Sequence, residues 1–118
     1  MLSSKYRFHS RGGVRYTLSR GKSIRTDKLT IISNINTRGG QRFAVVVSKK
    51  IFKSAVARNR IRRRVYEAIR NNFTQAAIDQ VFIVNSREVK DMSFAELEFD
   101  IRELMTKAAK SAKIKRTE

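Results

Sequence analysis

The chain has 118 residues, no cysteine, and a formal net charge of +17 from 27 lysines and arginines against 10 acidic residues. This length suits one domain, 1–118, with a single modest core. The lack of cysteine excludes disulfides and thiolate metal sites and fits a cytoplasmic location. No apolar stretch approaches the roughly 18 residues that a membrane-spanning helix needs.

The excess positive charge lies in the first part of the chain. Residues 1–66 carry 18 lysines and arginines and one acidic residue, Asp27, whereas residues 67–118 carry nine residues of each sign. Such asymmetry favours a nucleic-acid partner, or less often an anionic membrane. A membrane is disfavoured because the apolar residues opposite the basic ones are mostly Ala, Val and Ile of core size.

A short helix is expected first. Val14 and Leu18 are four residues apart, as one helical face requires. The pair Gly12-Gly13 predicts that this helix begins after the glycines, at about 14–20, and that Gly21 closes it. His9, the single histidine of the chain, is interpreted as an ordinary surface or capping group.

Two strands are predicted next, at 28–36 and 42–48, and the segment near 21–28 is expected to extend or kink the first. Alternation assigns the side chains of each strand to two faces. The residues expected to face the core are Leu29, Ile31, Ser33, Phe43, Val45 and Val47. Those on the opposite face are Thr30, Ile32, Asn34, Ala44, Val46 and Ser48, and the small side chains of the second strand leave space there.

The chain is organised around residues 48–70, in which nine of 23 residues are basic and Glu67 is the one acidic residue. From Ser54 onward the apolar period becomes helical, and it predicts a buried stripe of Val56, Ala57, Ile61, Val65, Ala68 and Ile69. The rest of the circumference carries Asn59, Arg60, Arg62, Arg63, Arg64 and Arg70, with Arg58 at its border. Closely spaced arginines repel one another, and each guanidinium can grip phosphate through two hydrogen bonds. The helix is therefore expected to lie against a polyanion.

The last third predicts a short buried strand at 80–84 and a final helix. Ser93-Phe94-Ala95-Glu96 resembles a capping box. The helix that it opens has an apolar side made of Phe94, Leu97, Ile101, Leu104, Met105 and Ala108. The ends, 1–7 and 110–118, are expected to fray. The element order αβββαβα predicts an α+β two-layer sandwich, with helices on one or both faces of a four-stranded sheet.

The run Ser48-Lys49-Lys50, followed after a short spacer by Ala55-Val56-Ala57-Arg58-Asn59-Arg60-Ile61-Arg62-Arg63, closely resembles the signature of the bacterial ribonuclease P protein component. Gly21-Lys22-Ser23-Ile24 resembles a second element of that family, and about 100 of the 118 residues are covered. The resemblance implies a fold similar to the second domain of a small-subunit ribosomal protein, with a left-handed β-α-β crossover. General rules for such crossovers would instead favour the right-handed form.

The resemblance also implies two binding surfaces. The first would hold the catalytic RNA through Lys49, Lys50, Lys53, Arg58, Asn59, Arg60, Arg62, Arg63 and Arg64. The second is a cleft for the 5′ leader of precursor tRNA, lined by Val14, Leu18, Thr30, Ile32, Ala44, Val46 and Ser48. Many relatives have aromatic side chains in this cleft. Their replacement here by aliphatic ones should weaken stacking on the bases.

The sequence shows no Gly-rich phosphate loop, no Ser/His/Asp set and no metal-ligand cluster, so binding rather than bond cleavage is expected of this chain. The resemblance implies a protein subunit of ribonuclease P, one per RNA, beside a catalytic RNA that binds magnesium and hydrolyses the leader. A structural ribosomal or assembly protein is one alternative. A DNA-binding module is a weaker one, because the arginines are spread too widely to read bases from one edge.

Overall fold

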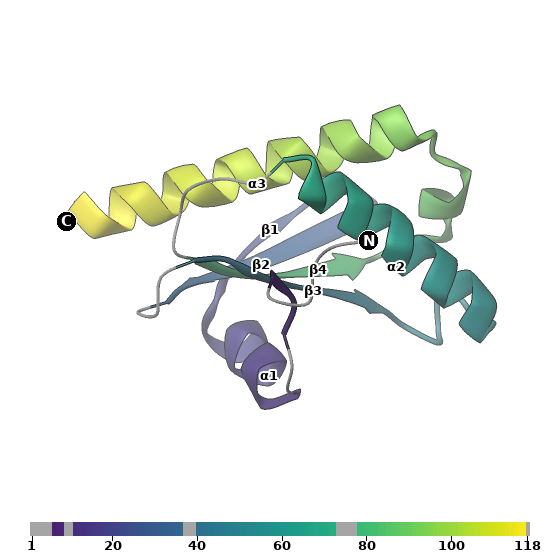
Figure 1. Cartoon of the computed structure of the whole chain (residues 1–118), viewed down its shortest axis with the longest axis horizontal. Helices are drawn as coiled ribbons and strands as arrows, with labels where there is room; N and C mark the ends of the chain where they lie inside the picture. Colours follow the sequence, from purple (N-terminus) through teal and green to yellow (C-terminus); the bar gives the residue numbers. More distant parts are fainter. Residues whose placement is uncertain (1–5, 9–10, 37–39, 73–77, 118) are drawn as a thin grey trace.

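The structure is a computed structural model that describes residues 6–8, 11–36, 40–72 and 78–117. Its elements, drawn in Figure 1, are α1 (Arg11–Arg20), β1 (Lys22–Arg25), β2 (Leu29–Ile35), β3 (Arg42–Val47), α2 (Ala55–Arg70), β4 (Ile78–Val84), the 3-10 helix η2 (Arg87–Asp91) and α3 (Phe94–Thr117). The α+β class and the predicted order of helices and strands are confirmed.

The strands form one mixed sheet in the order β1-β2-β4-β3. Its β1–β2 and β2–β4 pairs are antiparallel, and β3 runs parallel to β4. Parallel neighbours need a crossover connection, and here α2 supplies it. The left hand that the resemblance implies for this crossover stays a prediction.

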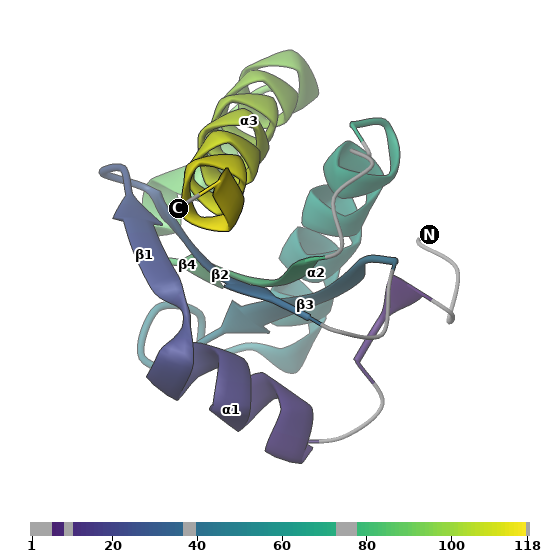
Figure 2. The same ribbon diagram turned by 90° about the vertical axis from the view of Figure 1, so that its left-hand side faces the viewer.

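Helices cover both faces of the sheet. Figure 2 shows α2 and α3 together on one face and α1 on the other. The main core lies between the sheet and the α2–α3 layer, where the largest fully buried side chains include Phe43, Phe82 and Leu29. The sheet and the α2–α3 layer form the predicted two-layer sandwich. Helix α1 covers part of the opposite face of the sheet.

Alternation within the strands was predicted correctly, but β4 begins at Ile78 rather than at residue 80, and two boundaries nearer the start of the chain were wrong. Helix α1 begins at Arg11, so that both glycines lie in its first turn. Within the helix, Thr17 Oγ1 donates a hydrogen bond to the Gly13 carbonyl (3.1 Å), and the cost of about 1 kcal/mol for a glycine applies to a helix interior rather than to the first turn. The segment near 21–28 is a separate strand, β1, and a turn in which the Thr26 N–H donates to the Leu29 carbonyl (2.8 Å) leads from it into β2.

Two predicted core residues are exposed because each lies in the first turn of its helix. Val56 is 67% exposed and Phe94 is 39% exposed. Figure 1 shows the first turn of α2 extending past the end of the sheet. Tyr66, which the stripe omitted, is 8% exposed, and burial raises its pKa. The capping box is confirmed, since the Glu96 N–H donates to Ser93 Oγ (3.1 Å) and the Ser93 N–H donates to Glu96 Oε1 (3.3 Å).

The ends of the chain lie partly beyond the described residues. Residues 1–5 lie outside them, as do His9 and most of the predicted turn at 36–40. The backbone is helical as far as Thr117, and fraying at 110–118 stays a prediction. None of the described helices is long and apolar enough to cross a membrane.

Candidate nucleic-acid interface

The nine residues predicted to bind RNA lie on one continuous segment, the β3–α2 loop and α2. The loop is a tight turn, because the Ser48 carbonyl accepts hydrogen bonds from the N–H groups of Ile51 (3.1 Å) and Phe52 (3.0 Å). It presents three exposed lysines, Lys49, Lys50 and Lys53. Ser54 then caps α2 by accepting a hydrogen bond from the Ala57 N–H (3.3 Å). Loop and helix together form a surface that we call the basic strip, defined by Lys49, Lys50, Lys53, Arg58, Asn59, Arg60, Arg62, Arg63 and Arg64.

Two arginines of the basic strip bond to backbone carbonyls of neighbouring segments. Arg58 donates to the carbonyls of Phe52 (3.0 Å) and Lys53 (2.9 Å), which ties the loop to α2. Arg64 reaches across to η2 and its C-terminal cap, where it donates to the carbonyls of Val89 (3.3 Å) and Met92 (2.6 Å). Both guanidinium groups therefore help to hold the fold together, and their predicted RNA contacts stay predictions.

Arg60 and Arg63 differ from these two. Both are exposed, and no hydrogen bond or ion pair joins either side chain to another described residue. The nearby carboxylate of Glu67 is engaged with Arg70 (2.9 Å), and Arg62 donates a hydrogen bond to Asn59. Arg60 and Arg63 thus keep all their donors for an external acceptor, which is what a phosphate requires.

The residues predicted for the leader cleft lie on the sheet face that α1 covers, which we call the α1 face. Paired residues of neighbouring strands share a face. The register pairs Thr30 and Ile32 of β2 with Ile83 and Val81 of β4. On the other side of β4, Val81 pairs with Ala44 and Ile83 pairs with Val46 of β3. Val81 and Ile83 were not among the predicted cleft residues, because the sequence does not show that β4 lies between β2 and β3.

The members of the α1 face differ in how much surface they offer. Thr30 is 7% exposed and accepts a hydrogen bond from Asn85 Nδ2 (2.6 Å), and Ala44 is 9% exposed. The remaining members are half-buried or exposed: Val14, Leu18, Ile32, Val46 and Ser48. A ligand on this face would therefore meet the second group, while Thr30 and Ala44 serve mainly as packing.

Gly21 sets the distance between α1 and the sheet. A Cβ at this position would lie 2.7 Å from Ile32 Cγ2, 2.7 Å from the Thr17 carbonyl oxygen and 2.8 Å from the Ser33 carbonyl oxygen. Only glycine permits so close an approach. Thr17 is 1% exposed and faces the sheet. The position of Val14 and Leu18 above β2 therefore depends on this one glycine.

An aromatic ring, Phe8, also lies at the α1 face and was not among the residues predicted for the cleft. The Phe8 N–H donates to the Phe43 carbonyl (3.2 Å), and the Phe8 ring lies under the Arg42 guanidinium, 4.4 Å from ring centroid to carbon. Arg42 in turn forms a two-point ion pair with Asp79, with distances of 3.2 and 2.9 Å. Arg42 and Asp79 are paired in register and share the face of Ala44. Phe8 is thus an aromatic group beside the predicted cleft that helix periodicity could not reveal.

These features define a small basic α+β domain whose cationic strip and partly apolar second face suit a polyanionic partner. Among the described residues, no group of three or more His, Cys, Asp or Glu side chains could hold a metal ion.

Comparison with known proteins identifies the family. The family model described as Ribonuclease P matches residues 2–109. The chain is 33% identical over 107 residues to the ribonuclease P protein component of Clostridium kluyveri, covering 87% of this chain and 94% of that protein. It is 30% identical over 92 residues to the corresponding protein of Finegoldia magna, covering 76% and 79% of the two chains. The chain belongs to the ribonuclease P protein family.

Solved structures agree on the fold. The RNase P protein of Staphylococcus aureus has a TM-score of 0.71 at 24% identity, covering 92% of this chain and 95% of that one. The RNase P protein of Thermotoga maritima has a TM-score of 0.73 at 23% identity, covering 83% and 93% of the two chains. The α+β fold with its four-stranded mixed sheet is therefore the fold of this family.

Proposed function

We propose that this chain is the protein subunit of the ribonucleoprotein ribonuclease P, an endoribonuclease that matures the 5′ ends of tRNA. In this role it binds the catalytic RNA and the 5′ leader of precursor tRNA, and so assists removal of the leader. The observation that carries the proposal is the pair Arg60 and Arg63, exposed and without a partner among the described residues, within the segment that matches the family signature.

The basic strip suits an RNA backbone. Arg60 and Arg63 are three residues apart on α2, so they lie on neighbouring turns of one side, where each can bind a phosphate. Lys49, Lys50 and Lys53 extend the positive surface along the loop. Neutralising about six to ten phosphates would release their counterions, and the logarithm of affinity should then fall by several units for each unit of log salt.

Bond cleavage belongs to the RNA in this proposal. Magnesium, the cofactor, is bound mainly by phosphate and other oxygens of the RNA, the ligands that this ion prefers, since a surface as cationic as the basic strip repels it. The protein's part is to screen phosphates, which strengthens RNA folding and metal binding, and to hold the substrate. One protein per RNA, with the complex in the cytoplasm, is the expected assembly.

The α1 face is proposed to meet the leader. Its accessible residues are mostly aliphatic, so contact with the bases gains less than aromatic stacking, which supplies roughly 1–3 kcal/mol per base. Phe8 offers an aromatic ring at this edge, although its face toward Arg42 is occupied. Arg42 is already paired with Asp79, whereas Arg25 is exposed and pairs in register with Thr30 of this face. Leader binding here should therefore rest more on shape and on Arg25 than on stacking.

Cleavage of precursor tRNA by the cognate catalytic RNA, with and without this protein at low magnesium, tests the proposal. We expect faster cleavage with the protein, saturating at one equivalent per RNA. Co-purification separates the alternatives: a structured RNA of several hundred nucleotides supports ribonuclease P, ribosomal RNA supports an assembly role, and duplex DNA supports a DNA-binding module. An unchanged cleavage rate at saturating protein would refute the proposed function.

A further inference from the structure

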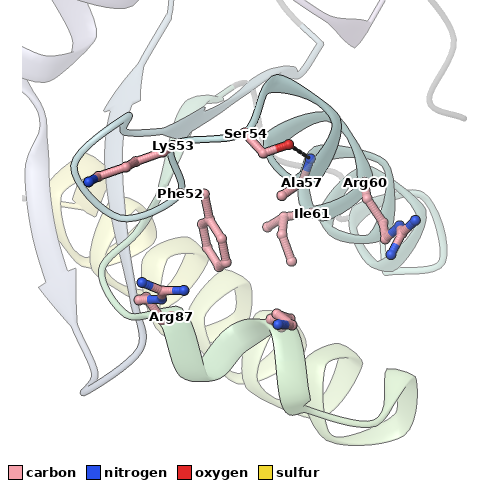
Figure 3. A pocket seen from close by; sticks show the side chains of 8 residues that line it. Phe52, Lys53, Ser54, Ala57, Arg60, Ile61 and Arg87 are labelled. Carbon is pink, nitrogen blue, oxygen red and sulfur yellow. Dashed lines mark hydrogen bonds between the residues drawn. The ribbon is translucent and has the colours of Figure 1, made fainter.

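A hollow of about 390 Å³ lies between the β3–α2 loop, the first turns of α2 and the 3-10 helix η2. Figure 3 shows Phe52 and Ile61 pointing into the space between α2 and η2. The volume falls in the range of about 300–1,000 Å³ that is usual for small-molecule sites. Its lining consists of Phe52, Lys53, Ser54, Ala57, Arg60, Ile61, Arg87 and Lys90.

The lining combines an apolar floor with a cationic rim. Phe52, Ala57 and Ile61 supply the floor, while Lys53, Arg60, Arg87 and Lys90 surround it, and no carboxylate is among the lining residues. Four positive charges around a space of this size repel one another unless an anion lies between them. The acidic residues of η2 are exposed and lie outside this lining. The hollow therefore suits a ligand with both a flat apolar part and negative charge.

Hydrogen bonds fix the walls of the hollow. Arg58 holds the carbonyls of Phe52 and Lys53, so that the loop wall is attached to α2. Arg64 holds η2 through the carbonyls of Val89 and Met92. Val89 and Met92 are themselves buried in the core. Because both walls are attached to the same helix, the site exists before any ligand arrives, which lowers the entropic cost of binding.

We propose that this hollow binds one unpaired nucleotide of the bound RNA, with its base packed mainly on Ala57 beside the nearly buried Phe52 and Ile61, which are 4% and 3% exposed, and its flanking phosphates on the four cations. The inference rests on the proposed function, which it deepens. An extruded base satisfies both parts of the lining, and proteins commonly recognise RNA through such splayed, unpaired bases. A bare phosphate would leave the floor unused, and a duplex is too wide to enter.

The proposal extends the RNA contact beyond the basic strip. Arg87 and Lys90 come from the second half of the chain, where positive and negative residues balance. The fold brings these two to the hollow that Arg60 also lines, while their acidic neighbours do not line it. The nucleotide would thus be held jointly by α2 and η2, and binding would lock these two elements together.

Titration of the isotopically labelled full chain by NMR, at constant chloride, tests the site. The three probes are adenosine 5′-monophosphate, ribose 5-phosphate and inorganic phosphate, and an acidic peptide is titrated for comparison. We expect the nucleotide to bind about tenfold more tightly than ribose 5-phosphate, with amide shifts concentrated at 52–61 and 87–90. Equal affinity for the two, or shifts centred elsewhere, would overturn the proposal, as would tighter binding of an acidic peptide.

Two variants separate the floor from the rim. Ala57→Leu fills the hollow without changing its charge, so it should abolish the preference for the nucleotide and keep phosphate affinity. Joint replacement of Arg87 and Lys90 by glutamine should weaken all three probes at least threefold. A matched control replaces Arg102 and Lys107, exposed on α3, by glutamine and should leave the affinities for all three probes and the nucleotide preference unchanged. If Ala57→Leu fails to fold, the glutamine variant and its control decide.

The cleavage assay keeps this inference apart from the proposed function. If the wild-type chain accelerates cleavage but binds the nucleotide and ribose 5-phosphate equally, the nucleotide site in the hollow is refuted and the proposed function stands. A chain that binds the nucleotide in the hollow but leaves cleavage unchanged would sink the proposed function and would leave a nucleotide site of another purpose, contrary to this inference. The cleavage rate and the nucleotide affinity can both be measured on one preparation of the wild-type chain.

Discussion

Replacing Arg64 by alanine should destabilise the fold, whereas replacing Arg60 and Arg63 should weaken RNA binding and leave stability nearly unchanged. Arg64 donates to the carbonyls of Val89 and Met92 at 3.3 and 2.6 Å. Hydrogen bonds from a charged group contribute about 1.5–3 kcal/mol. Since Arg64 is half-buried, water can replace part of this interaction, and we expect a loss of about 2 kcal/mol.

The double variant of Arg60 and Arg63 removes two exposed guanidiniums that bond to no other described residue. Surface changes of this kind alter stability by about 0.5 kcal/mol or less, and relief of repulsion along α2 acts in the stabilising direction. Binding to the catalytic RNA should weaken by roughly 1–3 kcal/mol. The slope of log affinity against log salt should fall by about 1.8 if each arginine neutralises one phosphate.

Urea unfolding followed by circular dichroism, at one fixed sulfate concentration, measures the first effect. With a slope of about 2 kcal/mol per molar urea, the Arg64→Ala midpoint should fall by about 1 M. Filter binding across a range of salt concentrations measures the second. A double variant that unfolds earlier than Arg64→Ala, or that keeps the wild-type salt slope, would refute this division of the arginines.

Four further predictions concern other parts of the molecule. Val46→Asp should weaken binding of precursor tRNA with a long leader but not of mature tRNA, because a carboxylate on the α1 face would repel leader phosphates; holoenzyme binding assays measure both. Gly21→Ala should lower the free energy of unfolding by about 2 kcal/mol or more through overpacking, whereas Gly12→Ala, where a Cβ meets nothing within 4 Å, should raise it by about 0.5–1 kcal/mol. Hydrogen bonds from Ser93 hold the pKa of Glu96 below its usual 4.5. The ionised Glu96 therefore stabilises the fold above pH 4.5, and this stabilisation is lost as the pH falls through the lowered pKa. The difference in thermal midpoint between wild type and Glu96→Gln should accordingly vanish in acid. Helix and sheet signals should rise as sulfate is titrated into an anion-poor solution, because anions that bind the folded state offset the repulsion of 17 net charges.

Each of these has a result that would count against it. Equal weakening of mature tRNA by Val46→Asp would remove the leader from the α1 face. Similar stability of the two glycine variants would show that α1 can shift without cost. A wild-type advantage over Glu96→Gln that persists at the lowest pH would mean that the carboxylate charge is unimportant. Full structure in anion-poor solution would show that the charges are already well separated.

The faces of the strands and the capping box of α3 were predictable because both depend on residues that are close together in the sequence. Period-two alternation placed Phe43, Val45 and Val47 in the core, and the spacing of Ser93 and Glu96 gave the start of α3. The burial of residues in a first helical turn was harder to predict. A helical wheel has no information on where a helix meets its sheet, so Val56 was placed in the core although it lies in an overhanging first turn.

The candidate site was predictable in its residue types but not in how those residues are used. The sequence shows that Arg58, Arg60 and Arg64 share one helix. It does not show that the partners of Arg58 and Arg64 are backbone carbonyls. Every residue has a carbonyl, so the residue types do not indicate which carbonyls accept these hydrogen bonds. Similarly, Arg87 reaches the hollow only because Arg64 fixes η2 against α2. Long-range contacts of this kind exist only once the chain is folded.

Arginine rather than lysine on α2 follows from these two uses. A guanidinium has five donors in a rigid plane, so Arg58 and Arg64 can each bond to two carbonyls and keep their charge, which lysine would do less well. The same charge then adds to the field that attracts phosphate at Arg60 and Arg63. The interactions that close the loop and η2 against α2 therefore also build the cationic surface. RNA binding should consequently increase the free energy of unfolding. The arginines of α2 repel one another in the folded state, and any anion that neutralises this surface reduces that repulsion.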